Sequence, residues 1–469
     1  MQTIKSKKIP YQADSAPLFD ALRDLPDAIW LDSGKPHSTQ GRFDIISASP
    51  DTVIETHNAS STISDRSGTR SSDQDPFVLA DQLMAPLRPI DPSIDAPFVG
   101  GLLGYFGYDL GRKPTDSKPA NTSITTLPDM RLGRYLWSLV VDHQAKCSHL
   151  YFHQQCATAL RHDICQRLES VTRQLLRQSQ QQSSNGQSFK LLNSFSPTLS
   201  QPQYHSAIGQ IKEYILSGDC YQVNFTQHLS ADYQGDLWQA YLTLRDVAPS
   251  PYSVYWQWAD KAILSLSPER FIKSEVSDGQ INIETKPIKG TILRGETAEQ
   301  DQRNAEQLLN SSKDRAENLM IVDLLRNDLG KNCRPGSIHV PKLFNLESFP
   351  NVHHLVSTVT GVLDPNSTLT ELLRDSFPGG SITGAPKKRA MEIIDELEPI
   401  KRSVYCGSIG YICASNRMDT NIAIRTLVVD DKQIHCWGGG GIVADSQADE
   451  EFDESMNKIR LLLDTLENL

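Results

Sequence analysis

The chain has 469 residues, 38% hydrophobic and 22% charged, which is typical of a soluble globular protein of two to three domains. Its 46 basic and 57 acidic residues leave a net charge of −11, which argues against a general affinity for nucleic acid. No apolar run approaches the roughly 18 residues of a membrane span, and the basic start lacks the apolar segment of a secretory signal. The eight cysteines form no CxxC pair. We therefore expect a cytoplasmic protein with reduced thiols.

The first part of the chain alternates short strand-like runs with a glycine-rich apolar segment, FVGGLLGYFGYDL, and ends in a predicted helix from Ala157 to Leu176. The Gln/Ser-rich stretch that follows has no apolar periodicity, which is typical of a linker. We therefore divide the chain into an N-terminal region (1–176), a polar linker (177–195) and a C-terminal region (196–469).

The C-terminal region begins with an amphipathic helix that Gly218 should end. Long strands are predicted over 220–233 and 252–275, a helical stretch over 301–329, and two further strands over 403–415 and 418–438, before a terminal helix. Strand runs followed by helices, without a βαβ rhythm, favour an α+β fold with largely antiparallel sheets.

Two acidic helices carry candidate metal ligands. Glu451, Glu454 and Lys458 share one face of the terminal helix, and Glu317 shares a face of another helix with Asp314. Carboxylates that converge from two helices suit Mg²⁺, which completes its octahedron with water and substrate oxygens. Spacing alone favours the simpler alternative of solvated faces with local salt bridges.

Other segments could bind anions. The stretch FPGGSITGAPKKRAM pairs a glycine turn with a helix start that Thr383 or Gly384 could cap, and Gly438–Gly441 could bring backbone amides close to a carboxylate. Arg425 interrupts an apolar strand pattern, so it needs an anionic partner, either a ligand carboxylate or a protein acid. His354 alone is more typical of a core histidine.

The segment KPIKGT contains two lysines around a proline. Pro287 should end regular strand pairing and Gly290 should allow a sharp turn, which leaves Lys289 in a bend. A lysine in a turn is usually a solvated charge, and we expect Lys286 to be one.

Nine motifs occur together in one order along the chain. They are GDCYQVNFTQ, LSLSPERF, KPIKGT, DRAENLMIVDLLRNDLG, VHHLVS, FPGGSITGAPK, CGSIGY, IRT and GGGGIVADS…EEFDES. In this order they resemble the chorismate-utilising enzymes, densely over residues 200–469 and more thinly before. The resemblance implies antiparallel sheets packed as a sandwich with flanking helices. One departure is Gly438, where relatives usually have alanine.

Two positions indicate which members of this family the chain resembles most. Members that add water to chorismate carry a lysine base where this chain has Gln222, so Gln222 indicates the ammonia-using members. PIKGT, with Lys289, is similar to members that aminate C4 of chorismate, whereas PIAGT marks those that form anthranilate, which remain the alternative.

The resemblance also implies roles. Lys289 would be the nucleophile, Glu269 the acid that protonates the leaving hydroxyl, and His354 a member of the polar site. Mg²⁺ would lie on Glu317 and Glu454, with Glu451 in support. Substrate-binding roles fall to Arg425, Tyr411, Gly439, Gly440, Lys458, Ser381, Thr383 and Gln222.

Ammonia needs a source, and the sequence shows no glutaminase nucleophile motif. A separate glutamine amidotransferase subunit is therefore expected, giving a heterodimer. Relatives also hold a tryptophan-responsive pocket in the N-terminal region, so the resemblance implies a site for a tryptophan-like ligand near Ser33. Two other classes stay open: a sensor that binds chorismate or an aromatic amino acid without catalysis, and a pyridoxal enzyme with Lys289 as its Schiff base.

Overall fold

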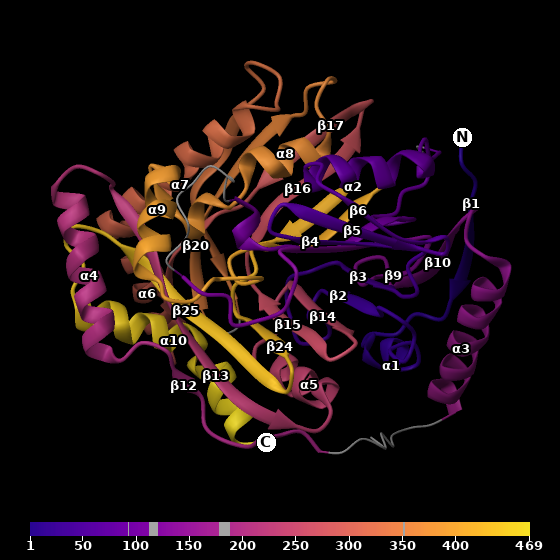
Figure 1. Cartoon of the computed structure of the whole chain (residues 1–469), viewed down its shortest axis with the longest axis horizontal. Coiled ribbons are helices and arrows are strands. Elements are labelled where there is room, and N and C mark those ends of the chain that lie inside the picture. Colours follow the sequence, from indigo (N-terminus) through magenta and orange to yellow (C-terminus); the bar gives the residue numbers. More distant parts are fainter. Residues whose placement is uncertain (92, 112–120, 178–187, 350–351) are drawn as a thin grey trace.

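A computed structural model describes residues 1–91, 93–111, 121–177, 188–349 and 352–469. Two large, mostly antiparallel sheets, with helices around them, make up the chain (Figure 1). Most of the predicted linker, residues 178–187, lies outside the described residues. None of the helices in the described ranges is both long and apolar enough to cross a membrane.

The first sheet contains 13 strands among the described residues. In spatial order these are β1 (Ile4–Ile9), β10 (Cys147–His153), β9 (Trp137–Asp142), β3 (Phe43–Ser47), β2 (Ile29–Asp32), β14 (Tyr252–Trp258), β15 (Lys261–Ser267), β24 (Thr426–Asp430), β25 (Gln433–Ile442), β13 (Gln222–Gln234) and β11 (Lys190–Leu191), with β12 (Ser196–Pro197) and β21 (Gly384–Ala385) also paired to β13.

The second sheet contains 12 strands in the same described ranges. Their order is β18 (Ile288–Leu293), β20 (Val352–Val362), β17 (Gln280–Thr285), β16 (Arg270–Ser277), β23 (Met418–Asn421), β22 (Ser408–Cys413), β7 (Gly101–Phe106), β8 (Met130–Tyr135), β4 (Thr52–His57), β5 (Ser60–Asp65) and β6 (Gly68–Ser72), with β19 (His339–Ser348) on the other side of β20.

Helices cover the sheets, and local sequence fixes several of their starts. A capping box begins α8, in which Thr368 and Glu371 satisfy each other's backbone N–H groups. The helices are α1 (Ala16–Asp20), α2 (Pro76–Met84), α3 (Thr158–Arg177), α4 (Gln201–Leu216), α5 (Leu237–Val247), α6 (Ala298–Asn310), α7 (Ser312–Gly330), α8 (Leu369–Ser376), α9 (Lys387–Leu397) and α10 (Ala448–Glu467), with short 3₁₀ turns η1 (Ala85–Leu87), η2 (Tyr108–Gly111) and η3 (Gly380–Ile382).

The two sheets share one hydrophobic core, as the predicted sandwich requires. Side chains from strands of both sheets belong to a single buried cluster. Trp256 of β14 in the first sheet meets Tyr105 of β7 in the second, edge to face, with ring centroids 6.0 Å apart. A smaller cluster lies between β13, α4 and α9. The expected α+β fold with antiparallel sheets and flanking helices is confirmed.

Both sheets draw strands from the predicted N-terminal and C-terminal regions. In the first sheet β2 pairs with β14, and in the second β7 pairs with β22. Part of the predicted linker also enters a sheet, since β11 pairs with β13. The two regions therefore do not each carry a separate sheet.

The predicted strand over 418–438 is wrong in one respect that matters for function. It divides into β23, β24 and β25, and β23 belongs to the second sheet whereas β24 belongs to the first. The predicted strand over 252–275 divides in the same way, since β14 and β15 belong to the first sheet and β16 to the second. Arg425 lies at one crossing and Glu269 at the other, and the N–H of Ile422 donates to the carbonyl oxygen of Glu269 at 3.0 Å. The predicted helical stretch 301–329 is likewise two helices, α6 and α7, which meet at Ser311.

Candidate active site

Lys289 lies in strand β18, at a bulge, rather than in the predicted bend. The pairing of β18 with β20 shifts register between Ile288 and Thr291, so Lys289 and Gly290 form the irregular part. Gly290 has φ +88°, a left-handed conformation, and a Cβ there would lie 2.9 Å from the carboxyl of Asp314. Bulges re-aim side chains beside active sites, and this one turns Lys289 so that its Nζ donates to the carbonyl oxygen of Ser381 at 3.2 Å.

Charged groups from several elements surround Lys289. Burial lowers its pKa, Glu317 opposes that shift, and Lys458 adds to it. A lysine with a lowered pKa releases its proton more readily, which is what a nucleophilic amine needs. Lys286, by contrast, is partly exposed and pairs with Glu347 at 3.6 Å.

Glu269 is buried in the short connection between β15 and β16. Burial raises the pKa of its carboxyl to about 7, against the lowering effect of a hydrogen bond with the Ser381 side chain and of the Lys289 charge. A carboxyl with a pKa near neutrality can both hold and release a proton at physiological pH, so Glu269 has the property of a general acid.

Arg425 adopts φ +50°, which is uncommon for a residue other than glycine, directly before β24. Burial lowers the pKa of its guanidinium. Within the described residues no carboxylate lies within ion-pair distance of it. The alternative of an internal ion pair therefore finds no partner there, and the guanidinium is available to a ligand.

His354 lies on β20 beside this arginine. Burial, and then the charge of Arg425, lower the pKa of His354 to about 4, so the ring is neutral at physiological pH. Its Nδ1 is 2.8 Å from the hydroxyl of Thr291 on β18. That hydrogen bond ties the histidine to the strand that carries Lys289.

The glycine run is the end of β25 rather than a loop. Strand β24 pairs with β25 only as far as Cys436, so among the described residues no strand lies against the other edge of Gly438–Gly441. That edge offers backbone N–H groups to a ligand, next to Arg425, which directly precedes β24. A Cβ at Gly438 would lie 2.5 Å from the carbonyl oxygen of Ser455, so α10 approaches the sheet closely enough to require glycine here.

Three predicted groups of α10 gather around Gly440. A Cβ at Gly440 would lie 3.2 Å from Glu451 Oε2, 3.5 Å from Glu454 Oε1 and 3.6 Å from Lys458 Nζ. Lys458 donates to the carbonyl oxygen of Gly439 at 2.9 Å and pairs with Glu454 at 2.7 Å. Burial would raise the pKa of Glu454, but the charges of Lys458, Lys313 and Lys289 together outweigh it, and the pKa is lowered.

Glu317 of α7 completes this carboxylate set. Burial raises its pKa, the charge of Lys289 opposes that rise, and the charge of Glu454 adds to it. Burial also raises the pKa of Glu451, whose Oε1 accepts a hydrogen bond from Ser446 at 2.6 Å. Carboxylates from α7 and α10 therefore face the same space.

These carboxylates are hard oxygen donors of the kind that Mg²⁺ prefers. In the described part of the chain no three His, Cys, Asp or Glu side chains are already grouped tightly enough to hold a metal ion. Mg²⁺ needs only one or two protein carboxylates, because water and substrate oxygens supply the rest. The donor set of Glu317, Glu454 and Glu451 therefore fits the ion.

The remaining predicted residues fall into two groups. Gln222 is buried over Gly441, and Ser381 contacts both Lys289 and Glu269. Thr383 instead donates its hydroxyl to the carbonyl oxygen of Gly379 at 3.0 Å and caps no helix, because α9 begins after Pro386. Tyr411 packs edge to face on Phe98 at 5.7 Å, and its charged neighbours, Asp419 first, lie outside the cluster.

Sequence reasoning missed Lys313 and Thr291. Lys313 interacts with Glu451, Glu317 and Glu454, which raise its pKa against the effect of burial. Its position four residues before Glu317 on α7 was a usable signal. Nothing in the sequence marks Thr291, because its role depends on the pairing of β18 with β20.

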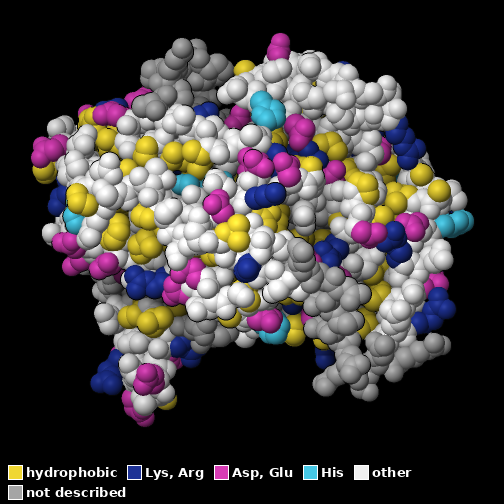
Figure 2. All heavy atoms as spheres, turned by 60° about the horizontal axis from the view of Figure 1, so that its bottom comes forward, with side chains coloured by type: hydrophobic (Ala, Val, Ile, Leu, Met, Phe, Trp, Pro, Cys, Tyr) yellow, Lys and Arg dark blue, Asp and Glu magenta, His cyan; other side chains and the backbone are white. Residues whose placement is uncertain are grey.

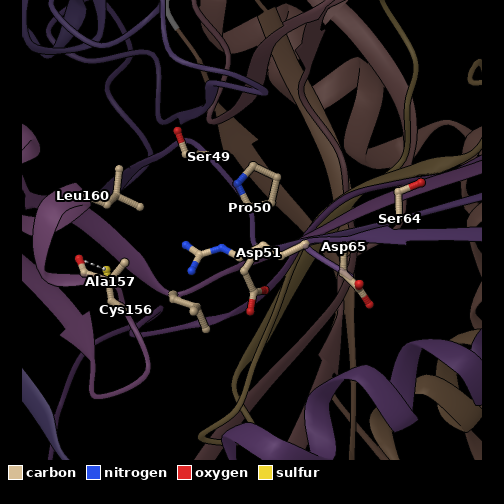
Figure 3. A pocket seen from close by; sticks show the side chains of 10 residues that line it. Ser49, Pro50, Asp51, Ser64, Asp65, Cys156, Ala157 and Leu160 are labelled. Atoms are coloured by element: carbon tan, nitrogen blue, oxygen red, sulfur yellow. Dashed lines mark hydrogen bonds between the residues drawn. The ribbon is translucent and has the colours of Figure 1, made fainter. Parts of the chain in front are cut away.

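The other surface features described below offer no alternative candidate for the active site. A pocket of about 470 Å³ lies near the start of α3 (Figure 3), and none of the predicted site residues lines it. One of its residues, Asp51, is already held by Arg134 at 2.7 Å. On the face shown in Figure 2, basic and acidic side chains are interspersed rather than gathered into one basic patch. Ser33 donates its hydroxyl to Asp44 at 2.6 Å, and binding of a tryptophan-like ligand there stays a prediction.

The chain that carries this charged cluster belongs to a known protein family. Residues 26–464 match the family model described as chorismate binding enzyme, and the chain is a member of that family. The aminodeoxychorismate synthase component 1 of Salmonella typhimurium is 44% identical over 463 residues, which cover 98% of each chain. The anthranilate synthase component 1 of Pseudomonas putida is 34% identical, with 97% of this chain and 94% of that protein covered.

A solved structure shows the same fold. The crystal structure of anthranilate synthase component I from Streptococcus pneumoniae TIGR4 superposes with a TM-score of 0.76 at 30% identity, over 90% of this chain and 92% of that chain. The family and fold expected from the nine sequence motifs are therefore confirmed.

Proposed function

We propose that the chain is the chorismate-aminating component of an aminodeoxychorismate synthase, which converts chorismate and ammonia to 4-amino-4-deoxychorismate. The observation that carries this proposal is Lys289, aimed by the β18 bulge at the carboxylate cluster with its pKa lowered. The 44% identity to the Salmonella typhimurium component 1 supports it. Such a product lies on the route to 4-aminobenzoate and folate.

The charges suit each part of the reaction. Arg425 and the amide of Gly439 bind the substrate carboxylates, because no protein acid in the described ranges competes for the arginine. The predicted role of the Gly440 amide is less favoured, because its N–H faces β13 in the strand pairing. Glu269 donates a proton to the C4 hydroxyl, which leaves as water as the C4–O bond breaks. Neutral Lys289 forms a bond from Nζ to C2 as the ring double bonds shift. Ammonia then bonds to C4, the double bonds shift back, and the bond from C2 to Lys289 breaks.

Mg²⁺ is part of the proposal. Glu317 and Glu454 would hold it, with Glu451 in support, and the ion would neutralise the ring carboxylate and withdraw electrons from C2. The charges of Lys313 and Lys458 offset part of the repulsion between these carboxylates.

Ammonia is proposed to come from a glutamine amidotransferase subunit. The name of the Salmonella typhimurium relative, component 1, refers to a protein with a further component. The purified chain should therefore use ammonium but not glutamine, and adding the partner should confer glutamine use. Glutamine-dependent turnover by the pure chain alone would refute this division of labour.

Anthranilate synthesis is the second candidate, because anthranilate synthase components are among the similar proteins. One assay separates the two. Purified chain, chorismate, ammonium and Mg²⁺ are incubated and the product is identified by mass. We expect aminodeoxychorismate, which keeps the enolpyruvyl group, and not anthranilate, which has lost it.

Metal dependence has its own test. Glu317→Gln and Glu454→Gln should abolish the response to Mg²⁺ while the fold persists, and Glu450→Gln, an exposed neighbour on α10, is the matched control. Full activity of the wild-type chain in excess chelator would remove the metal from the proposal.

A further inference from the structure

Arg402 is a buried cation in the connection between α9 and β22, and only 1% of it is exposed. Its guanidinium pairs with Glu398, from Nη2 to Oε1 at 2.7 Å and from Nε to Oε2 at 2.9 Å. The ring of Tyr108 covers the guanidinium, whose Cζ lies 4.6 Å from the ring centroid. The charge is therefore satisfied within the protein and is not available to a ligand.

The guanidinium also reaches two backbone carbonyls. Nη1 donates to the carbonyl oxygen of Ile382 at 2.8 Å, and Nη2 donates to that of Asn224 at 2.6 Å. The N–H of Asn224, on β13, donates in turn to the carbonyl oxygen of Thr383 at 2.7 Å. One planar fork thus ties the turn η3 to the first sheet, which a lysine could not do with its single nitrogen.

The turn depends on this support because its own backbone hydrogen bonds are long. The N–H of Ile382 donates to Gly379, and the N–H of Thr383 to Gly380, both at 3.4 Å. Typical bonds of this kind are roughly 2.9–3.0 Å long. The Thr383 hydroxyl adds one bond of ordinary length, to Gly379 at 3.0 Å. The bond from Arg402 is shorter than any of these.

Ser381, directly before Ile382, makes the contacts that matter for the chemistry. Its carbonyl oxygen accepts a hydrogen bond from Lys289 Nζ at 3.2 Å, and its side chain forms a hydrogen bond with the carboxyl of Glu269. The peptide planes that contain the carbonyls of Ser381 and Ile382 share one Cα and two soft dihedrals. Fixing the carbonyl of Ile382 therefore restricts the direction of the Ser381 carbonyl.

We propose that Arg402 is a positioning residue for the amination of chorismate, because it fixes the η3 turn so that Ser381 holds the nucleophile Lys289 and the acid Glu269 in place relative to each other. This inference rests on the proposed function. In this assignment Arg402 acts through Ser381 rather than on the substrate.

The first test is the turnover of Arg402→Lys. The variant keeps a positive charge beside Glu398 but lacks the fork that reaches Ile382 and Asn224 together. We expect kcat to fall roughly 10- to 100-fold, because small misplacements of reacting groups are costly. The KM for chorismate should change less than about twofold, because the substitution removes no contact with the substrate.

The second test needs no turnover. Infrared difference spectroscopy follows the proton on Glu269 in the free protein, with Glu269→Gln as the blank. The hydrogen bond of Ser381 and the charge of Lys289 both lower the pKa of Glu269, and Arg402→Lys should weaken both. The titration midpoint should therefore rise by about one pH unit. Lys458 also faces Glu269, but it is held by the glycine run of β25.

Arg245→Lys is the matched control. Arg245 is a buried arginine of the same kind, since it pairs with Asp32 at 2.7 Å and its Cζ lies 4.8 Å from the ring centroid of Trp30, but it lies in another part of the molecule. Both substitutions should lower the midpoint of thermal unfolding. Arg245→Lys should leave kcat and the titration of Glu269 as in the wild type.

Ser381→Ala tests whether Arg402 acts through this serine. It should also raise the titration midpoint of Glu269, because it removes the hydrogen bond to the carboxyl. When Ser381→Ala and Arg402→Lys are combined, the shift should fall short of the sum of the two single shifts, since both act on the same hydrogen bond.

Three results would overturn the assignment. They are an unchanged titration of Glu269 in Arg402→Lys, an equal shift in Arg245→Lys, and a combined shift equal to the sum of the single ones. If Arg402→Lys does not fold, Arg402→Gln combined with Glu398→Gln removes both charges together and is judged by the same titration. Failure of the proposed function is separate, because the wild-type chain would then show no ammonium-dependent turnover of chorismate while the titration still reports on the turn.

Discussion

Two arginines in different parts of the molecule show how buried charge can be used. Arg245 of α5 is fully buried against the N-terminal region, where it pairs with Asp32 at 2.7 Å and Asp14 at 3.0 Å. Burial alone would lower its pKa, but these carboxylates outweigh it and raise it. At the active site, burial lowers the pKa of Arg425 without opposition. The first charge is satisfied within the protein, and the second is left for a ligand.

The comparison separates charges that hold the fold from charges that act on a substrate. Replacing the second kind should cost turnover or affinity and leave stability nearly unchanged. Replacing the first kind should cost stability.

The largest effect is expected for Lys289→Ala. Removing the proposed nucleophile should lower turnover on the order of 10³-fold or more, while chorismate binding survives through Arg425. Steady-state kinetics and fluorescence titration measure the two quantities. In the wild type, an electrophilic chorismate analogue should label Lys289, and peptide mapping would locate the adduct. Near-normal formation of aminodeoxychorismate by the variant would reduce Lys289 to a structural strand residue.

Glu269→Gln should lower turnover by about 10²- to 10⁴-fold, because general acid catalysis contributes that much. The wild-type rate should fall as pH rises through about 7, since the acid form of Glu269 is then lost. Its raised pKa also affects stability. The folded chain holds this proton more tightly than the unfolded chain, so the stabilisation is present below pH 4.5 and is lost as pH rises toward 7.

Denaturation at two pH values checks that sign. Relative to the wild type, Glu269→Gln should gain stability at pH 8 compared with pH 4.5. A variant that lost stability more at pH 8 would show that Glu269 is ionised and paired in the folded chain.

The arginine pair tests the comparison directly. Arg245→Met should destabilise the chain by about 3–5 kcal/mol, because Asp32 is left buried without its partner. Arg425→Met should not lower stability, but it should raise the KM for chorismate roughly 10- to 100-fold, since a charged hydrogen bond is worth about 1.5–3 kcal/mol. Urea unfolding measures the stability of both variants, and steady-state kinetics measure their KM for chorismate. Equal destabilisation by the two substitutions would contradict the distinction between a structural and a substrate-binding arginine.

The smallest effect is expected for Lys286→Ala. Its pair with Glu347 is partly exposed and 3.6 Å long, so its loss should change stability by about 0.5 kcal/mol or less. Turnover should stay within twofold of the wild type. A large fall would mean that Lys286, and not only Lys289, faces the substrate.

Much of this site was predictable because its residues stand in recognisable local motifs. Glu269, Lys289, Glu317, Glu454 and Arg425 each come from a short motif, and the structure brings them together. The prediction failed where the outcome depends on partners distant in the chain. Periodicity cannot show that residues 418–438 change sheets, because apolar residues flank Arg425 on both sides of the crossing, at 422–424 and 427–429.

The same limit explains the smaller errors. Substrate binding by Tyr411 stays a prediction, and its edge-to-face contact with Phe98 depends on sheet packing that the sequence does not show. Thr383 looks like a helix cap in sequence, but its loop folds back so that the hydroxyl meets Gly379. Lys313 was overlooked because a lysine on an acidic helix is usually a solvated charge.

The crossings from β15 to β16 and from β23 to β24 also determine where the protein could be split for fragment complementation. Cleaving the chain between Pro268 and Glu269, or between Ile422 and Arg425, would free an end beside the acid or the arginine and disturb the Ile422–Glu269 hydrogen bond. A nick between Arg66 and Ser67, in the exposed turn that joins β5 to β6, touches neither crossing. Reporter halves built on this fold should therefore be divided in that turn.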